Sequence, residues 1–266
     1  HIGDLHNGSD PKLNDVTWKK ITLPHAFNED EAFRVAIDRH TDTIVWYRKH
    51  FRLPKSDRGK KVFLEFEGIR FGGEFFINGK SVGLHENGVM AAGFDITDQI
   101  NYSGENVVAV RIDNSWEYRE RGTNQRYQWN DRNFNANYGG IPKNVYLHVT
   151  NKLYQTLPLY SNLQTTGTYV YAREINVSKR SALIFAESEI RNEERYPRTF
   201  RYGMAIEDME GKVIHEIIGE EIMVKPGETI MAKVSSRVND LHFWSWGYGY
   251  LNNVKTTIYV ANRPAY

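Results

Sequence analysis

The sequence predicts an all-β protein made of two β-sandwich domains. Three observations lead to this prediction: aromatic residues form 13% of the chain, 21 glycines separate short apolar segments, and helical periodicity is almost absent. Aromatic and β-branched residues between glycine-containing turns favour strands over helices. One or two helical turns are expected only over 29–40. A length of 266 residues suits two domains of ordinary size.

The first domain is assigned to residues 1–151, where short strands follow one another. In 62–67, three apolar residues alternate with Phe63 and two glutamates, a pattern typical of a strand with one solvated face. Asn78-Gly79 stands between two apolar segments, and this pair readily takes both positive φ values of a type I′ hairpin turn. The spacing indicates a jelly roll or similar β-sandwich rather than a parallel sheet with helices. Strands are expected over 44–53, 62–67, 75–77, 81–84, 107–112 and 145–149.

The second domain is assigned to residues 152–266. A linker or a crossing between sheets is expected over 151–166, because this segment holds Leu157-Pro158-Leu159 and a run of Asn, Gln, Thr and Gly. Six or seven strands in about 100 residues is the size of an immunoglobulin-like sandwich. These strands are expected over 169–173, 182–191, 199–208, 213–224, 229–237 and 254–260.

The charge balance and the missing residue types exclude several classes of function. Lys plus Arg number 34 and Asp plus Glu 33, so the net charge is +1, whereas a dedicated nucleic-acid-binding protein needs a basic excess to neutralise phosphates. Without cysteine the chain has no disulfide, no thiolate nucleophile and no Cys-ligated zinc. No apolar run approaches the length of about 18 residues that a transmembrane helix requires, so no membrane span is expected.

The densest group of functional side chains lies in 116–138, between two predicted strands. These 23 residues hold six aromatic residues, four arginines and five asparagines. Aromatic rings stack on the C–H faces of sugars, amides and carboxylates bind vicinal hydroxyls, and arginine binds either a hydroxyl or a carboxylate. This mixture favours a carbohydrate ligand. The alternative is internal packing, in which the rings lie under the loop and the charges pair with one another.

Motifs for other chemistry are missing from the chain. It has no Walker A loop, no H-E-x-x-H, no G-x-S-x-G and no dinucleotide-binding fingerprint. His25, His85 and His148 fall within strand and turn patterns, and we expect them to be hydrogen-bonded structural residues rather than metal ligands. The paired carboxylates Glu65/Glu67 and Glu220/Glu221 are expected on the surface.

An ordered set of short motifs runs through nearly the whole chain. The segments are ITLPHAF (21–27), WYRKHF (46–51), FEGIR (66–70), FINGKSVGLH (76–85), FDIT (94–97), GEN (104–106), VRIDN (110–114), NYGGIPKNVYL (137–147), FWS (243–245) and YL (250–251). This set resembles glycoside hydrolase family 2, the β-galactosidase and β-glucuronidase family, in which LPHDW, WYRKxF, FEGV…VNGKxVGxH, YGGIYRDVxL and LWSP…PxLY follow one another. Two departures stand out: Glu86-Asn87-Gly88-Val89 replaces a common Gly-Gly-aromatic, and Ser245-Trp246 replaces the Ser-Pro after Trp244.

The resemblance implies a galactose-binding-like jelly roll over 1–151 and an immunoglobulin-like sandwich over 152–266. In the family a (β/α)8 barrel follows and carries both catalytic glutamates of a retaining glycosidase. These 266 residues contain no such barrel, so no catalytic residue is expected here and the chain by itself is expected to hydrolyse nothing. The implied partners are a β-linked glycan substrate and a C-terminal barrel of the same polypeptide, with no metal and no other cofactor.

The resemblance also places the sugar contact. In the family the first domain lends a loop to the rim of the active site, and an acidic residue shortly before YGGI touches the sugar. Asp131 is the first candidate here, although its spacing from Tyr138 is longer than in the family, so Asn133 or Asn135 is the alternative. The expected substrate-binding residues are Trp129, Asp131, Arg132, Asn133 and Asn135.

Three hypotheses follow for the chain. The first is a non-catalytic N-terminal part of a family 2 glycosidase, β-galactosidase-like, that shapes the cleft of the barrel. The second is a free-standing carbohydrate-binding or adhesion module, because a jelly roll with an aromatic loop can bind glycans unaided. The third is a purely structural spacer. Bacterial members of the family that degrade polysaccharides are often exported, so the resemblance suggests a bacterial protein in the periplasm or outside the cell.

Overall fold

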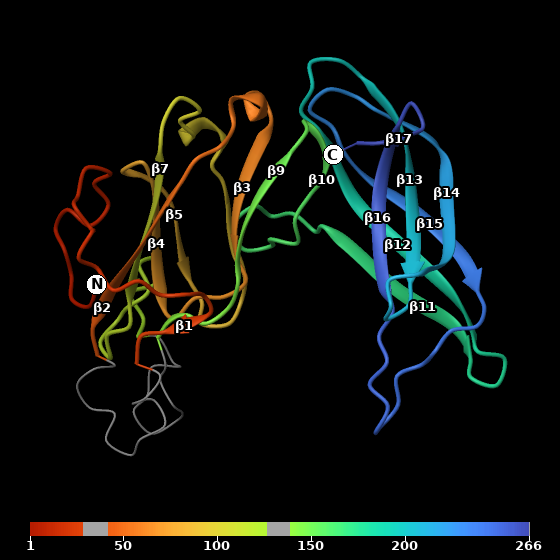
Figure 1. The fold of residues 1–266 in the computed structure, drawn as a ribbon, viewed down its shortest axis with the longest axis horizontal. Coiled ribbons are helices and arrows are strands. Elements are labelled where there is room, and N and C mark those ends of the chain that lie inside the picture. The colour runs from red at the N-terminus through yellow and green to blue at the C-terminus, as the bar shows by residue number, and fades with distance from the viewer. Residues whose placement is uncertain (29–41, 127–138, 266) are drawn as a thin grey trace. The chain divides into compact units, whose positions relative to one another are not determined.

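The computed structural model describes residues 1–28, 42–126 and 139–265. The helical turns expected over 29–40 lie outside this part of the chain. The chain forms two compact units, the first comprising His1–Val149 with Ser161–Leu163 and the second Thr150–Tyr160 with Gln164–Tyr266. Both are built from antiparallel strands, so the predicted all-β fold is confirmed (Figure 1). Within the described ranges, no helix has the length and apolar character needed to cross a bilayer.

The first unit consists of two sheets around one apolar core. The four-stranded sheet has the order β2-β7-β4-β5 and the three-stranded sheet the order β6-β3-β9, while β1 and β8 form a short pair of their own. The core is made of alternate residues of both sheets, such as Phe66, Phe75 and Ile112. The strands are β1 (His25–Ala26), β2 (Ile44–Phe51), β3 (Lys61–Phe66), β4 (Gly72–Ile77), β5 (Lys80–Glu86), β6 (Ala92–Asp95), β7 (Asn106–Asp113), β8 (Gly140–Ile141) and β9 (Val145–Thr150).

The Asn78-Gly79 turn between β4 and β5 is confirmed. Asn78 has φ 52° and Gly79 φ 82°, and Ile77 pairs directly with Lys80 across the turn. The Asn78 side chain also joins the turn to β7, because its Oδ1 accepts from the Val107 amide at 2.9 Å and its Nδ2 donates to the Asn106 Oδ1 at 2.9 Å. The turn is therefore fixed by the dihedral preference of its residues and by a partly buried amide contact.

Strand β3 differs from its expected half-solvated pattern. Lys61 and Phe63 on the expected polar face are buried, as are Val62, Leu64 and Phe66. The expectation that Glu65 lies on a solvated surface is therefore wrong: its side chain is 14% exposed and its Oε2 bonds the His148 Nε2 at 2.7 Å. Alternation predicts which residues share a face, but it does not reveal whether that face is covered.

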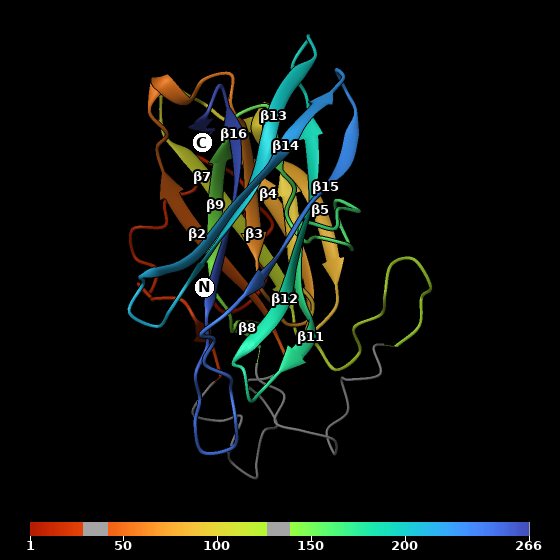
Figure 2. The ribbon, with the colours of Figure 1, turned by 90° about the vertical axis from the view of Figure 1, so that its right-hand side faces the viewer.

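The second unit is a sandwich of two further sheets (Figure 2). In one sheet β12 pairs with β10 and β11 on one side and with β15 on the other, and the second sheet has the order β14-β13-β16-β17. The linker or sheet crossing expected over 151–166 is wrong for 153–155, which form strand β10. The strands expected in this unit are confirmed. The strands are β10 (Leu153–Gln155), β11 (Thr168–Asn176), β12 (Ser181–Asn192), β13 (Arg198–Glu207), β14 (Val213–Val224), β15 (Thr229–Val238), β16 (Asn253–Val260) and β17 (Arg263–Pro264).

Candidate functional site

The candidate site is the loop that leaves β7 after Asp113 and returns at Gly139. All five expected sugar-binding residues fall within 127–138, which lies outside the described residues: Trp129, Asp131, Arg132, Asn133 and Asn135. The structure describes the two flanks of this loop, 114–126 and 139–141. Their contacts show how the first unit fixes the ends of the candidate site.

The first flank begins with a turn that buries Trp116. The Ser115 amide donates to the Asp113 Oδ1 at 3.1 Å, and the Trp116 amide donates to the Asp42 Oδ1 at 2.7 Å. The Trp116 side chain is only 3% exposed. A carboxylate that accepts a backbone amide holds the chain at the point where the strand ends. The loop therefore leaves β7 in a fixed direction.

Glu86, the last residue of β5, holds the next part of this flank. Its Oε1 accepts from the Tyr118 hydroxyl at 2.6 Å and from the Arg121 amide at 2.8 Å. Burial and then the neighbouring Glu86 carboxylate raise the pKa of Tyr118, which remains a hydrogen-bond donor at neutral pH. The Tyr118 ring also lies against Gly72, where a Cβ would come within 2.3 Å of its hydroxyl.

A network of charges on β4 and β7 continues from this contact. Glu74 Oε1 binds the Arg121 Nη2 at 2.6 Å and the Arg111 Nη1 at 3.0 Å. Arg111 also binds Asp4, with its Nη2 at 2.7 Å from the Asp4 Oδ2. The hydrogen bond from Arg111 lowers the pKa of Asp4 to about 2. Arg121 is thus a structural part of the loop base, as the internal-packing alternative predicts.

Arg126 behaves in the same way as Arg121. Its Nε donates to the Trp116 carbonyl at 3.1 Å, and its Nη2 lies 3.4 Å from the Glu117 Oε1. Arg119 donates to the Asn124 carbonyl at 3.1 Å. These contacts within 116–126 are of the kind that the internal-packing alternative expects. The arginines of the described flank therefore take part in holding the base of the loop.

The second flank is held by a buried asparagine and two glycines. The Gly139 amide donates to the Asn28 Oδ1 at 2.8 Å, and the Phe27 amide donates to the Gly139 carbonyl at 3.0 Å. Gly140 has φ +122°, and a Cβ there would lie 2.5 Å from the Tyr47 hydroxyl and 2.8 Å from the His25 carbonyl. Both the conformation and the space therefore require glycine at this position.

The histidines occupy structural positions, as expected. His25 Nδ1 lies 2.9 Å from the Tyr47 hydroxyl, and His85 Nε2 lies 3.2 Å from the Met90 carbonyl. Burial lowers the pKa of His85 and raises the pKa of Tyr47. His148 bonds Glu65, as described above. In 1–28, 42–126 and 139–265, no three His, Asp or Glu side chains are placed to hold a metal ion.

Sequence reasoning missed the groups that anchor the loop. Asp42, Glu74 and Glu86 are distant in sequence from the loop, and Asn28 is joined to it only through the fold. For two of them the position in the sequence was a signal: Glu86 ends a predicted hairpin, and Asn28 directly follows the ITLPHAF motif. The glycines of the second flank were visible in the NYGGIPKNVYL motif.

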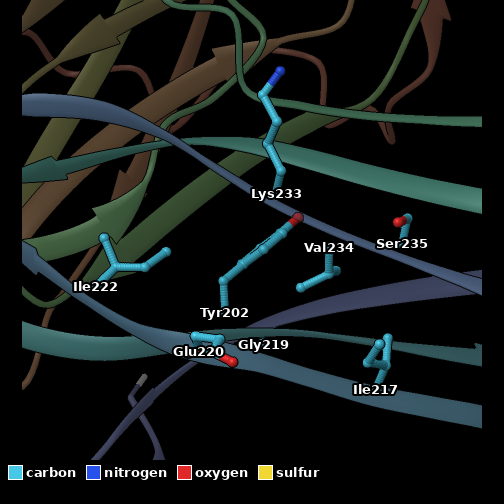
Figure 3. A pocket seen from close by; sticks show the side chains of 8 residues that line it. All are labelled: Tyr202, Ile217, Gly219, Glu220, Ile222, Lys233, Val234 and Ser235. Carbon is cyan, nitrogen blue, oxygen red and sulfur yellow. The ribbon is translucent and has the colours of Figure 1, made fainter.

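A separate pocket of about 280 Å³ opens on the second unit, between β14 and β15 (Figure 3). It lies at a bulge in β14, because Arg201 pairs with Glu221 whereas Gly203 pairs with Ile218. Two of its polar lining residues have partners in the second unit: the Lys233 Nζ binds the Glu187 Oε2 at 3.1 Å, and the Tyr202 hydroxyl lies 2.7 Å from the Ser188 Oγ. Glu220 at the rim is exposed, as expected for the Glu220/Glu221 pair. The lining residues are Tyr202, Ile217, Gly219, Glu220, Ile222, Lys233, Val234 and Ser235.

Comparison with known proteins gives a consistent set of relatives. A family model described as "Glycosyl hydrolase 2 galactose-binding domain-like" matches residues 16–150. A β-glucuronidase of Formosa agariphila is 36% identical over 96% of this chain, and β-galactosidase BoGH2A of Bacteroides ovatus is 26% identical over 97%.

Solved structures agree with the curated relatives. A structure described as a β-glucuronidase from glycoside hydrolase family 2 matches with a TM-score of 0.86 and 32% identity over 99% of this chain and 28% of its own. A family 2 member from Bacteroides cellulosilyticus has the same fold, with a TM-score of 0.78 at 22% identity over 100% of this chain and 34% of its own. The chain spans 26% of the Formosa protein and 28% of the Bacteroides ovatus protein, about a quarter of each.

Proposed function

Because the chain belongs to glycoside hydrolase family 2, we propose that it is the non-catalytic N-terminal part of a retaining glycosidase. In this proposal a catalytic barrel elsewhere in the polypeptide carries out hydrolysis. The first unit lends the loop between β7 and β8 to the substrate cleft, where it contacts the sugar. The second unit, an immunoglobulin-like sandwich, supports this arrangement.

The observation that carries the proposal is the anchoring of both flanks of the loop. One flank is held by Asp42 and Glu86, and the other by Asn28 and the pairing of β8 with β1. Long loops with firmly held ends are a common way to present binding residues from a rigid sandwich. The described arginines at the base are engaged with Glu74, Glu117 and backbone carbonyls. The proposal therefore assigns ligand binding to the polar residues of 127–138.

The composition of that segment suits a sugar. Trp129 supplies a ring for stacking, Asp131 and two asparagines supply partners for hydroxyl groups, and Arg132 can bind a carboxylate with two parallel hydrogen bonds. A β-glucuronide carries such a carboxylate and a β-galactoside does not. Since the β-glucuronidase relative is the more similar of the two enzymes described above, β-glucuronides are the first substrates to test, followed by β-galactosides.

The test uses the complete gene product, obtained by reading the gene beyond the codon for Tyr266. Asp131→Ala in that enzyme is expected to lower kcat/KM by at least about tenfold, because a charge-assisted hydrogen bond contributes roughly 1.5–3 kcal/mol. The matched control is Asp98→Ala, which removes an exposed carboxylate from the short 3-10 turn Thr97–Gln99 near the opposite end of β7. This control is expected to retain full activity.

Each other hypothesis predicts a different result. Unchanged kcat and KM in Asp131→Ala would favour a structural spacer. Micromolar binding of galactose, glucuronate or oligosaccharides to the 266-residue chain, measured by calorimetry, would favour a free-standing binding module. Turnover of chromogenic β-glucuronides or β-galactosides by the 266-residue chain, lost on mutating a residue within it, would overturn the non-catalytic assignment.

A further inference from the structure

The second unit carries a strongly exposed aromatic hairpin between β15 and β16. We use the name aromatic hairpin for residues 242–252, which extend beyond the ends of the strands in both views (Figures 1 and 2). Trp244 is 64% exposed, Trp246 94% and Leu251 69%. Scattered apolar side chains on a surface are ordinary, but so many within one hairpin mark an interaction site. This is also where Trp246 replaces the proline of the family motif.

The aromatic hairpin is held in one conformation. Ser245 and Tyr248 exchange two backbone hydrogen bonds, of 3.0 and 2.9 Å, and Gly247 between them has φ +79°. The rings of His242, Tyr248 and Tyr250 form a stack, with centroids 4.7 and 5.8 Å apart. A preformed surface loses little conformational entropy when it binds a partner.

The base of the aromatic hairpin is fixed as well. Arg180 donates from its Nε to the Leu241 carbonyl at 3.1 Å and from its Nη2 to the Asp240 carbonyl at 3.1 Å. Asn252 donates from its Nδ2 to the His242 carbonyl at 3.2 Å. The Arg180 guanidinium and the Asn252 Nδ2 are therefore used to hold the base of the hairpin.

The chemistry of this surface favours a protein partner over a glycan. Residues 242–252 contain no Asp, Glu, Lys or Arg. Depletion of charge with enrichment in Trp and Tyr is typical of the centre of a protein interface. The most exposed side chains, Trp244, Trp246 and Leu251, offer a sugar hydroxyl no carboxylate and no amide.

We propose that the aromatic hairpin docks on the part of the glycosidase polypeptide that lies outside the quarter matched here. This proposal rests on the proposed function, since it requires the relatives' remaining three quarters to have a counterpart in this protein. The partner surface is expected to be an uncharged apolar hollow that accepts Trp246 and Leu251. The hairpin would then hold the second unit on the catalytic part of the enzyme.

Hydroxyl-radical footprinting with mass spectrometry tests this on unmodified protein. Oxidation of Trp246 is compared between the 266-residue chain and the complete gene product. We expect at least a tenfold slower oxidation of Trp246 in the complete product. Tyr196, which is 54% exposed elsewhere on the second unit, serves as the control and should react equally in both. Trp246→Ala in the complete product should also increase tryptic cleavage between the second unit and the rest of the polypeptide, whereas Tyr196→Ala should not.

The outcomes separate the two proposals. If the gene encodes nothing beyond these residues, both proposals fail. If the complete enzyme is active and Trp246 oxidises at the same rate in both proteins, only the docking proposal fails. If Trp246 in the 266-residue chain is protected more strongly as the protein concentration rises, the docking proposal is wrong and the hairpin mediates self-association. If added oligosaccharide protects Trp246 in the 266-residue chain, the docking proposal is wrong and the hairpin binds glycan.

Discussion

Individual polar side chains fasten the N-terminal segment of the first unit to β2. Asp15 Oδ2 accepts from the Arg48 Nε at 2.7 Å and lies 2.9 Å from the His50 Nε2. The other ring nitrogen of His50 lies 2.9 Å from the Glu105 Oε2. With a carboxylate at each ring nitrogen, the imidazole is stabilised as a cation that donates twice. The hydrogen bond that His50 donates to Asp15, followed by the one that it donates to Glu105, raises the pKa of His50.

This contact predicts a pH-dependent contribution to stability. A histidine whose pKa is raised by folding stabilises the protein fully below its unfolded pKa of about 6.5, and the contribution is lost as the pH rises through the folded pKa. His50→Gln should therefore lower the unfolding free energy by up to about 1 kcal/mol at pH 5.5, a figure reduced for solvent screening because the side chain is 37% exposed.

The difference between His50→Gln and wild type should fade by about pH 9. Urea unfolding at a series of pH values measures it. The control is His6→Gln, which changes an exposed histidine of the same segment and should show no such trend. A difference between His50→Gln and wild type that is constant with pH would contradict the assignment of a charged His50.

Gly140 illustrates how one residue supports the candidate site. Gly140→Ala should reduce the unfolding free energy of the first unit by about 2–4 kcal/mol, because the new methyl group meets both the Tyr47 hydroxyl and the His25 carbonyl. Gly59→Ala is the matched control: φ is +89° there, but nothing lies within 4 Å of the added Cβ. Gly59→Ala should therefore lose only the free energy that a positive φ costs an alanine, about 1–2 kcal/mol. Equal losses in urea unfolding would show that crowding at Gly140 is unimportant.

Among the elements, the first flank of the loop depends on a single residue of β5. Glu86→Ala removes the acceptor of both the Tyr118 hydroxyl and the Arg121 amide. Trypsin should then cleave after Arg119, Arg121 and Arg126 at least about fivefold faster, since opening of the flank becomes easier by roughly 1–3 kcal/mol. Glu117→Ala is the control, because this carboxylate is 77% exposed and has a long ion pair with Arg126. Equal cleavage rates in the two variants would refute the anchoring role of Glu86.

Sequence patterns identified the strands of this protein more reliably than the surroundings of those strands. Alternation and Asn78-Gly79 are local properties, so they predicted the β4–β5 hairpin with its turn. Burial of Phe63 and pairing of Glu65 with His148 depend on what covers the face of β3, which no local pattern encodes. The same limit applies to the candidate site: composition marked 116–138, whereas the anchoring roles of Asp42 and Glu86 arise from contacts distant in sequence.

The two units have separate apolar cores. Ile112 belongs to the core of the first unit and Ile190 to that of the second, and both are fully buried. Ile112→Ala and Ile190→Ala should each cost about 3–4 kcal/mol in the unit that contains the change and leave the other unit's transition in place. Differential scanning calorimetry of the 266-residue chain measures both transitions. A single transition that both substitutions shift equally would mean that the units unfold as one.

The independent fastening of the loop's two flanks has an engineering consequence. Asp42, Glu86 and Asn28 bind residues on either side of 127–138 and belong to the sandwich itself. Under the proposed function, exchanging 127–138 for the equivalent segment of a homologue is expected to change ligand preference while these three anchors keep their contacts.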